Sequence, residues 1–111
     1  MRTVVVDIDA RIDLIDILNT SHRNFGRATS QRYRRLIDQA LSDLARDPER
    51  RGSVLFETGI YIYHLRHSRL SAPVEIRVRT PRHLLIYRFT DEDVQISRVL
   101  HDSMDIPSRL K

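Results

Sequence analysis

The 111-residue chain contains no cysteine, and this absence excludes several kinds of chemistry. Without a thiol there is no disulfide, no thiolate zinc site and no cysteine nucleophile, and such a composition fits a reducing cytoplasm. No apolar run approaches the roughly 20 residues of a membrane span, and the one at the N-terminus is too short for a signal peptide. We therefore expect a cytoplasmic protein that does not bind a membrane.

Glycine is also scarce. Gly26, Gly52 and Gly59 stand far apart, so no glycine-rich loop is available to hold a phosphate. No two histidines have the helical spacing of a metal site, and no Gly-x-Ser-x-Gly nucleophile motif occurs. We expect neither a metal nor a cofactor.

Lysine occurs only once, at Lys111, so 18 of the 19 basic residues (19 − 1) are arginine. The formal net charge is +4. Arginine forms flat, bidentate contacts with phosphate and carboxylate groups. The composition is typical of a surface for nucleic acid or for an acidic protein, and it also fits arginines that are merely solvated.

Two helices are predicted in the first half of the chain. Ile12, Ile15 and Ile17/Leu18 recur at helical spacing through about residue 19, and the polar stretch 21–26 breaks the pattern. A longer amphipathic helix follows, from Thr29 or Ser30 to Asp47, where Pro48 ends it. Two helices joined by a short break indicate an antiparallel hairpin.

The strands are predicted around this hairpin. A β-branched run over 3–8 opens the chain, and period-two runs follow at 60–65, 74–78, 83–90 and 94–100. The stretch 48–57 is predicted to be a connection, and 69–73 a hairpin tip. The order β-α-α-β-β-β gives an α+β fold of one domain, residues 1–111, with the helices packed on one face of a C-terminal antiparallel sheet.

Basic residues gather on the second half of this sheet. Arg77 and Arg79 should project from one strand face together, and Arg98 should share a face with Val94, Ile96 and Leu100. Because a buried arginine needs a partner, we expect Arg98 at the sheet rim, paired with Asp102 or Asp105, or lining a concave site. The cluster is either a solvated face or a contact surface. The candidate partner-binding residues are Arg77, Arg79, Arg82, Arg88, Arg98, His101 and Asp105.

A catalytic role is the alternative interpretation of the same region. A metal-free ribonuclease needs a base, an acid and cations around the phosphorane, and histidine titrates near neutral pH. The candidate catalytic residues would then be His83, Tyr87, Arg98 and His101. A local tie between His101 and Asp105 would explain their spacing without catalysis, and no catalytic residue is favoured.

The C-terminal third resembles a known signature. The segment 81–89 carries R-x-x-x-x-Y-R from Arg82 to Arg88, and I-x-R-V-L-H-x-x-x-D runs from Ile96 to Asp105. Together with the preceding hairpin this is similar to the RelE/ParE superfamily of toxins, over about residues 5–110. The resemblance implies the toxin of a bacterial type II toxin–antitoxin pair, held inactive by a cognate antitoxin and contacting operator DNA only through it.

Two activities occur in that superfamily. ParE-type toxins poison DNA gyrase as binding proteins, whereas RelE-type toxins cut messenger RNA on the ribosome. No aromatic residue follows Phe89 and the lysines common in RelE-type sites are absent, so the resemblance favours the gyrase-directed type and a protein that is not an enzyme. A ribosome-dependent endoribonuclease, or an inactive toxin that acts only as a co-repressor partner, remains the alternative.

Overall fold

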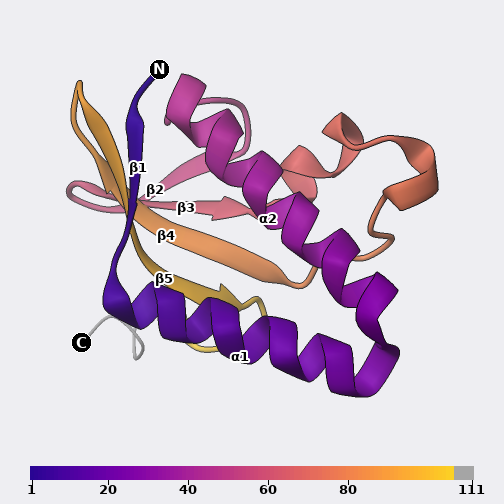
Figure 1. The fold of residues 1–111 in the computed structure, drawn as a ribbon. Helices are drawn as coiled ribbons and strands as arrows, with labels where there is room; N and C mark the ends of the chain where they lie inside the picture. Colours follow the sequence, from indigo (N-terminus) through magenta and orange to yellow (C-terminus); the bar gives the residue numbers. More distant parts are fainter. Residues whose placement is uncertain (107–111) are drawn as a thin grey trace.

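A five-stranded sheet and a helix hairpin make up the part of the chain that the computed structural model describes, residues 1–106. The helices lie over one face of the sheet (Figure 1). The strand order is β1-β5-β4-β3-β2, with β1 parallel to β5 and every other pair antiparallel. The bounds are β1 Thr3–Val6, α1 Ile8–Phe25, α2 Arg27–Arg46, β2 Ser53–Glu57, β3 Ile60–His64, β4 His83–Phe89 and β5 Asp93–His101. The predicted α+β class is confirmed, and β1 adds a parallel edge to the antiparallel strands.

The two helices are separated by a single residue. Gly26 has φ +90°, a backbone conformation that favours glycine, and it ends α1 and begins α2. The predicted break over 21–26 was therefore too wide, because polar side chains that face solvent do not stop a helix. The predicted end of α2 is confirmed, since the helix stops at Arg46 and Pro48 follows shortly after.

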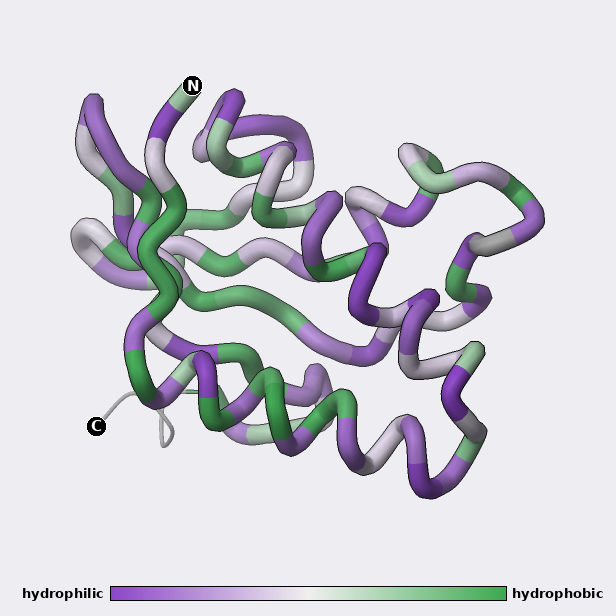
Figure 2. The backbone as a smooth tube through the Cα atoms, in the orientation of Figure 1, coloured by the Kyte–Doolittle hydropathy of each residue, from purple (hydrophilic) through white to green (hydrophobic). Residues whose placement is uncertain are grey.

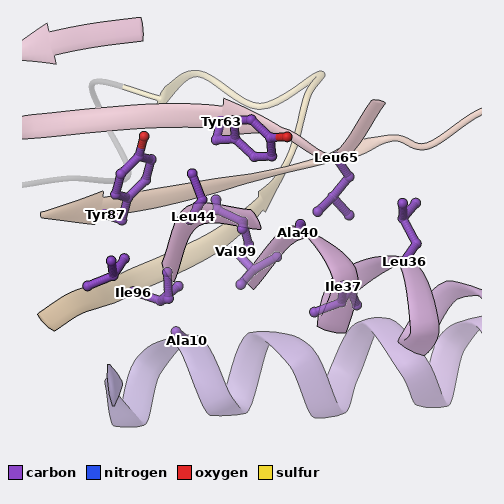
Figure 3. Packing of buried hydrophobic residues seen from close by; sticks show 12 residues of the cluster. Ala10, Leu36, Ile37, Ala40, Leu44, Tyr63, Leu65, Tyr87, Ile96 and Val99 are labelled. Atoms are coloured by element: carbon purple, nitrogen blue, oxygen red, sulfur yellow. The ribbon is translucent and has the colours of Figure 1, made fainter. Parts of the chain in front are cut away.

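The main core lies between the hairpin and the sheet. Leu36, Ile37, Ala40 and Leu44 from α2 are buried against Tyr87 and neighbouring strand residues (Figure 3). The helical period of α2 predicted this face. Figure 2 shows the hydrophobic colour concentrated along the strands beneath the helices, as expected for a core formed on one side of a sheet.

The outward side of α1 differs from the prediction. Ala10 is buried and Leu14, Ile17 and Leu18 pack against the core, but the side chains of Ile12 and Ile15 are 58% and 61% exposed. The isoleucines in the predicted stripe therefore divide between two faces of the helix. Apolar residues cover so much of α1 that periodicity alone did not identify the buried side.

Two strand predictions in the second half were wrong. The stretch 48–57, predicted as a connection, contains β2, an edge strand whose Val54 and Leu55 are both exposed, so it shows no alternation. The predicted strand 74–78 is instead a short 3₁₀ helix, η2 (Val74–Ile76), which follows η1 (Leu65–Ser71). Its sequence neighbours β3 and β4 each have a strand on both sides, so neither offers a free edge for a hairpin with this segment.

A β-bulge changes the facing of β5. Tyr87 pairs with Ile96 and Ile86 pairs with Arg98, so Ser97 is an extra residue in β5. Val94 and Ile96 join the core under the helices, whereas Leu100 packs with Leu84 and Ile86 on the other face. The prediction that Val94, Ile96 and Leu100 share one face was wrong because of this inserted residue.

Candidate functional site

Three histidines meet at one end of the sheet, which we call the histidine end: His64, His83 and His101. His64 ends β3, His83 begins β4 and His101 ends β5, and antiparallel pairing places these positions side by side. His83 and His101 are cross-strand partners, and their rings meet edge to face with centroids 5.2 Å apart. The structure thus brings together the two histidines that the sequence offered as candidate proton carriers.

His83 is held in its neutral form by its surroundings. The Tyr33 hydroxyl accepts a hydrogen bond from the Arg82 backbone N–H (3.1 Å) and lies within hydrogen-bond distance, 2.6 Å, of His83 Nδ1. Burial, together with the nearby His101, lowers the pKa of His83 to about 4. An imidazole with a pKa of about 4 is a weak base and is not protonated near pH 7, which is a poor starting point for acid–base catalysis.

Asp102 links the outer side of the histidine end. Its Oδ1 accepts hydrogen bonds from Arg82 Nη2 (2.9 Å) and Nε (3.0 Å). Its Oδ2 lies 3.3 Å from the same Nε and 3.0 Å from His64 Nε2. His64 Nδ1 accepts the Arg66 backbone N–H, so its proton is on Nε2 and points to Asp102. Arg82 and His64 lower the pKa of Asp102 to about 2. The carboxylate is therefore already bound by Arg82 and His64.

Arg98 lies away from the histidine end, in a bond with helix α1. Its Nε and Nη2 donate to the two oxygens of Asp13 at 2.8 and 3.0 Å, and the Val99 backbone N–H donates to the same carboxylate at 2.9 Å. The expected pairing of Arg98 with Asp102 or Asp105 was wrong. Asp13 stands three residues after the buried Ala10 and therefore lies on the inward side of α1. This position was the only indication in the sequence that Asp13 contacts the sheet.

Tyr87 is buried in the core. Its side chain is fully buried and its hydroxyl donates to the Pro48 carbonyl at 2.5 Å. Burial also raises the pKa of Tyr87. Of the four candidate catalytic residues, Tyr87 and Arg98 are therefore tied into structural contacts, and only His83 and His101 lie together.

The remaining predicted contact residues are spread over several segments. Arg77 donates through Nη2 to the Ala72 carbonyl (2.9 Å), and its predicted strand neighbour Arg79 lies in a loop, so the two do not project from a strand face. Arg88 is exposed on β4, at the opposite end from the histidines. His101 Nδ1 lies 2.7 Å from Ser103 Oγ and 3.6 Å from Asp102 Oδ1, and Asp105 is exposed.

A pocket of about 430 Å³ opens beside the histidine end. Its lining is dominated by arginine and includes one carboxylate: His64, Arg66, Arg69, Arg79, Thr80, Pro81, Arg82 and Asp102. Arg66, Tyr33 and Asp102 were not among the predicted site residues. A run of arginines in the sequence predicts charge, but it does not tell which side chains converge on one space.

A second exposed feature is the outer face of α1, which we call the α1 stripe: Ile8, Ile12 and Ile15. These side chains are 74%, 58% and 61% exposed, and their spacing places them on one face of the helix. The stripe leads into a groove between the two helices of about 340 Å³, whose lining includes Ile15, His22, Arg27 and Arg34. An apolar stripe beside basic residues is typical of a surface that a partner covers.

Two negative findings hold for residues 1–106. No group of three or more histidine or acidic side chains in this range could hold a metal ion. Within the same range, neither helix has the length and apolar content needed to cross a bilayer.

Comparison with known proteins identifies a family and solved structures of similar fold, one of which is described here. The chain matches a family model described as the ParE toxin of the type II toxin–antitoxin system parDE over residues 4–106. A solved structure titled "Chromosomal ParDE TA system from P. aeruginosa" aligns with a TM-score of 0.66 at 15% identity, covering 91% of this chain and 96% of that chain. That identity supports the fold alone. No curated protein sequence matches.

Proposed function

Because the chain belongs to the ParE toxin family of type II toxin–antitoxin systems, we propose that it is a gyrase-directed toxin that acts by binding in the cytoplasm. The observation that carries the proposal is the separation of the candidate catalytic residues. Arg98 is bound to Asp13, Tyr87 is buried, and His83 is kept neutral beside Tyr33. Such a set supports a protein that works by binding rather than by bond cleavage.

The test is a gyrase poisoning reaction. Refolded full-length toxin is incubated with gyrase, ATP and supercoiled plasmid, and detergent and protease then release any trapped cleavage product. We expect linear plasmid that disappears when the cognate antitoxin is added. The double variant His83→Gln/His101→Gln should poison gyrase as well as the wild type does, because action by binding requires no proton transfer from either imidazole.

A ribosome-dependent endoribonuclease is the competing function, and one observation favours it: the contact between His83 and His101. Toxin that arrests growth but yields no linear plasmid, and whose arrest is lost in the double histidine variant, would support this competitor. Toxin that is harmless without antitoxin would point instead to a co-repressor partner that has lost its activity.

We place the antitoxin on the α1 stripe and the adjoining groove. The three isoleucines supply apolar area, and His22, Arg27 and Arg34 in the groove favour acidic residues on the partner. This position replaces the expected contact through Arg98, whose guanidinium is already bound within the chain.

A charge placed on the stripe tests this position. Ile12→Asp should weaken antitoxin binding at least tenfold in a titration, because it places a charge in the centre of the contact. Leu70→Asp is the matched control, since Leu70 is 72% exposed and lies in η1, away from the helices' outer groove. Equal weakening by both variants would remove the stripe as the docking site.

A further inference from the structure

The arginines around the pocket beside the histidine end differ in how far their charges are already used. Arg82 is bound to Asp102, and Arg69 Nε donates to the Val78 carbonyl at 2.6 Å. Arg66 and Arg79 are exposed, and within residues 1–106 their guanidinium groups make no ion pair or hydrogen bond. Four arginines against one carboxylate leave the pocket strongly positive, with two guanidinium groups available to a ligand.

The positive surface extends beyond the pocket. His67 in η1 lies against Gly52, so closely that a β-carbon on Gly52 would fall 2.4 Å from the imidazole. Burial is the largest cause that lowers the pKa of His67, and the charges of Arg66, His64, Arg50 and Arg51 lower it further. We call the following arginines the basic surface: Arg50 and Arg51 before β2, Arg66 and Arg69 in η1, and Arg79 and Arg82 in the loop before β4.

We propose that this basic surface binds the phosphate backbone of double-stranded DNA, with the pocket seating one phosphate between Arg66 and Arg79. Two carboxylates near these arginines, the buried Asp43 and Asp102 at the pocket, are already paired with Arg50 and Arg82. The η1–η2 segment projects from the body of the molecule, where a duplex can reach it (Figure 1). This contact goes beyond gyrase binding and needs no antitoxin.

The surroundings of the arginines favour a duplex over other polyanions. Unpaired bases are held by stacking on exposed aromatic side chains, and none lines the pocket. A surface of guanidinium groups alone suits phosphates whose bases are paired and hidden, and it reads no sequence.

The experiment is fluorescence anisotropy of a labelled short duplex titrated with refolded full-length toxin, repeated at several salt concentrations. Non-specific binding of this kind has a Kd of about 10⁻⁴ to 10⁻⁶ M at physiological salt, and it tightens as salt falls. Arg66→Ala/Arg79→Ala should lower the slope of log K against log salt by about 2, since each lost phosphate contact removes roughly 0.9. Arg66→Glu/Arg79→Glu should weaken binding by more than about tenfold at low salt.

The matched control is Arg32→Glu/Arg35→Glu on the exposed side of α2, which changes the net charge by the same amount. It should weaken binding by less than about threefold. Equal loss in the two Glu variants would overturn the proposal, because binding would then follow net charge alone. The absence of saturable duplex binding, tighter binding of single-stranded RNA, or equal competition by polyglutamate would each overturn it as well.

The result is independent of the gyrase assay. Duplex binding with no plasmid cleavage would leave the DNA contact standing and remove gyrase as the target. If the wild type binds no duplex and plasmid cleavage is unchanged in Arg66→Glu/Arg79→Glu, gyrase remains the target and the DNA contact is removed. Circular dichroism of each variant confirms folding, which the two substitutions should not disturb because both side chains are exposed and unbonded within the described chain.

Discussion

Two arginine environments in the second half of the chain contrast sharply: the seam where Arg98 meets α1, and the basic surface around Arg66 and Arg79. At the seam, the Asp13 carboxylate accepts hydrogen bonds from Arg98 Nε and Nη2 and from the Val99 backbone N–H. These bonds join helix α1 to the sheet. On the basic surface, the guanidinium groups of Arg66 and Arg79 have no acceptor within residues 1–106. The same residue type therefore acts as a structural link in one place and as an open ligand site in the other, and the carboxylate opposite decides which.

Removing the carboxylate at the seam should have the largest effect on stability. Asp13→Ala leaves the half-buried Arg98 charge and the Val99 N–H without their acceptor, so we expect a loss of about 3 kcal/mol in the free energy of unfolding. Urea unfolding followed by circular dichroism measures it. Asp16→Ala, an exposed position on the same helix, is the control and should change stability by less than about 0.5 kcal/mol. Similar losses in the two variants would mean that the seam is no stronger than a surface contact.

Acid should weaken the histidine end through His83. Its pKa falls from 6.5 to about 4 on folding, so between these values the unfolded chain takes up a proton that the folded chain does not. Stability should therefore drop as pH falls from 6.5 to 4, by about 2 kcal/mol once partial exposure is allowed for, and remain level above 6.5. In His83→Gln, which keeps an acceptor for Tyr33, this drop should disappear from urea midpoints measured across that range.

A smaller effect at lower pH should come from Asp102. Its pKa lies at about 2 when folded against 3.8 for the unperturbed group, so its contribution is present above 3.8 and is lost as pH falls through 2. Because the carboxyl is partly exposed, we expect a contribution of about 1 kcal/mol. Asp102→Asn should lose this amount of unfolding free energy at pH 7, and its stability should fall less steeply with acid between pH 3.8 and 2. An unchanged acid limb would mean that Arg82 and His64 do not stabilise the carboxylate.

The smallest effect on the free energy of unfolding should come from Arg66 and Arg79. Arg66→Ala and Arg79→Ala should each change the free energy of unfolding by less than about 0.5 kcal/mol, because neither guanidinium has a bond within the described chain to lose. Chemical denaturation of the two variants beside Asp13→Ala makes the contrast quantitative. A loss above about 1 kcal/mol in either would show that the arginine is a structural link after all.

The sequence was a good guide where local pattern and burial agree. The period of α2 identified Leu36, Ile37, Ala40 and Leu44 as its buried face, and the apolar run of β4 identified a central strand. It failed at 74–78, because alternation predicts a strand but cannot tell whether a neighbouring strand has a free edge. It failed for β2 because an edge strand exposed on both faces has no alternation to detect.

The site was less predictable than the fold. Arg98 and Asp13 are 85 residues apart, and nothing in either segment marks them as partners. His83 and His101 could be named from the sequence, but their contact depends on the register of β4 against β5, which contains a bulge. Pairings across the sheet are a property of the register, and one inserted residue reverses every face that follows it.

The parallel pairing of β1 with β5 bears on the order in which the molecule folds. Thr3 lies beside Asp93, 90 positions later (93 − 3), so the first strand to be made has no neighbour until the last strand exists. Strands β2, β3, β4 and β5 pair with strands that follow one another along the chain and can form early, whereas closure of this long loop is entropically costly and slow. A nascent chain that stops before β5 leaves β1 without a partner strand, and it leaves Asp13 without Arg98. Synthesis of β5 is therefore the step at which the N-terminal strand and helix can first dock on the sheet.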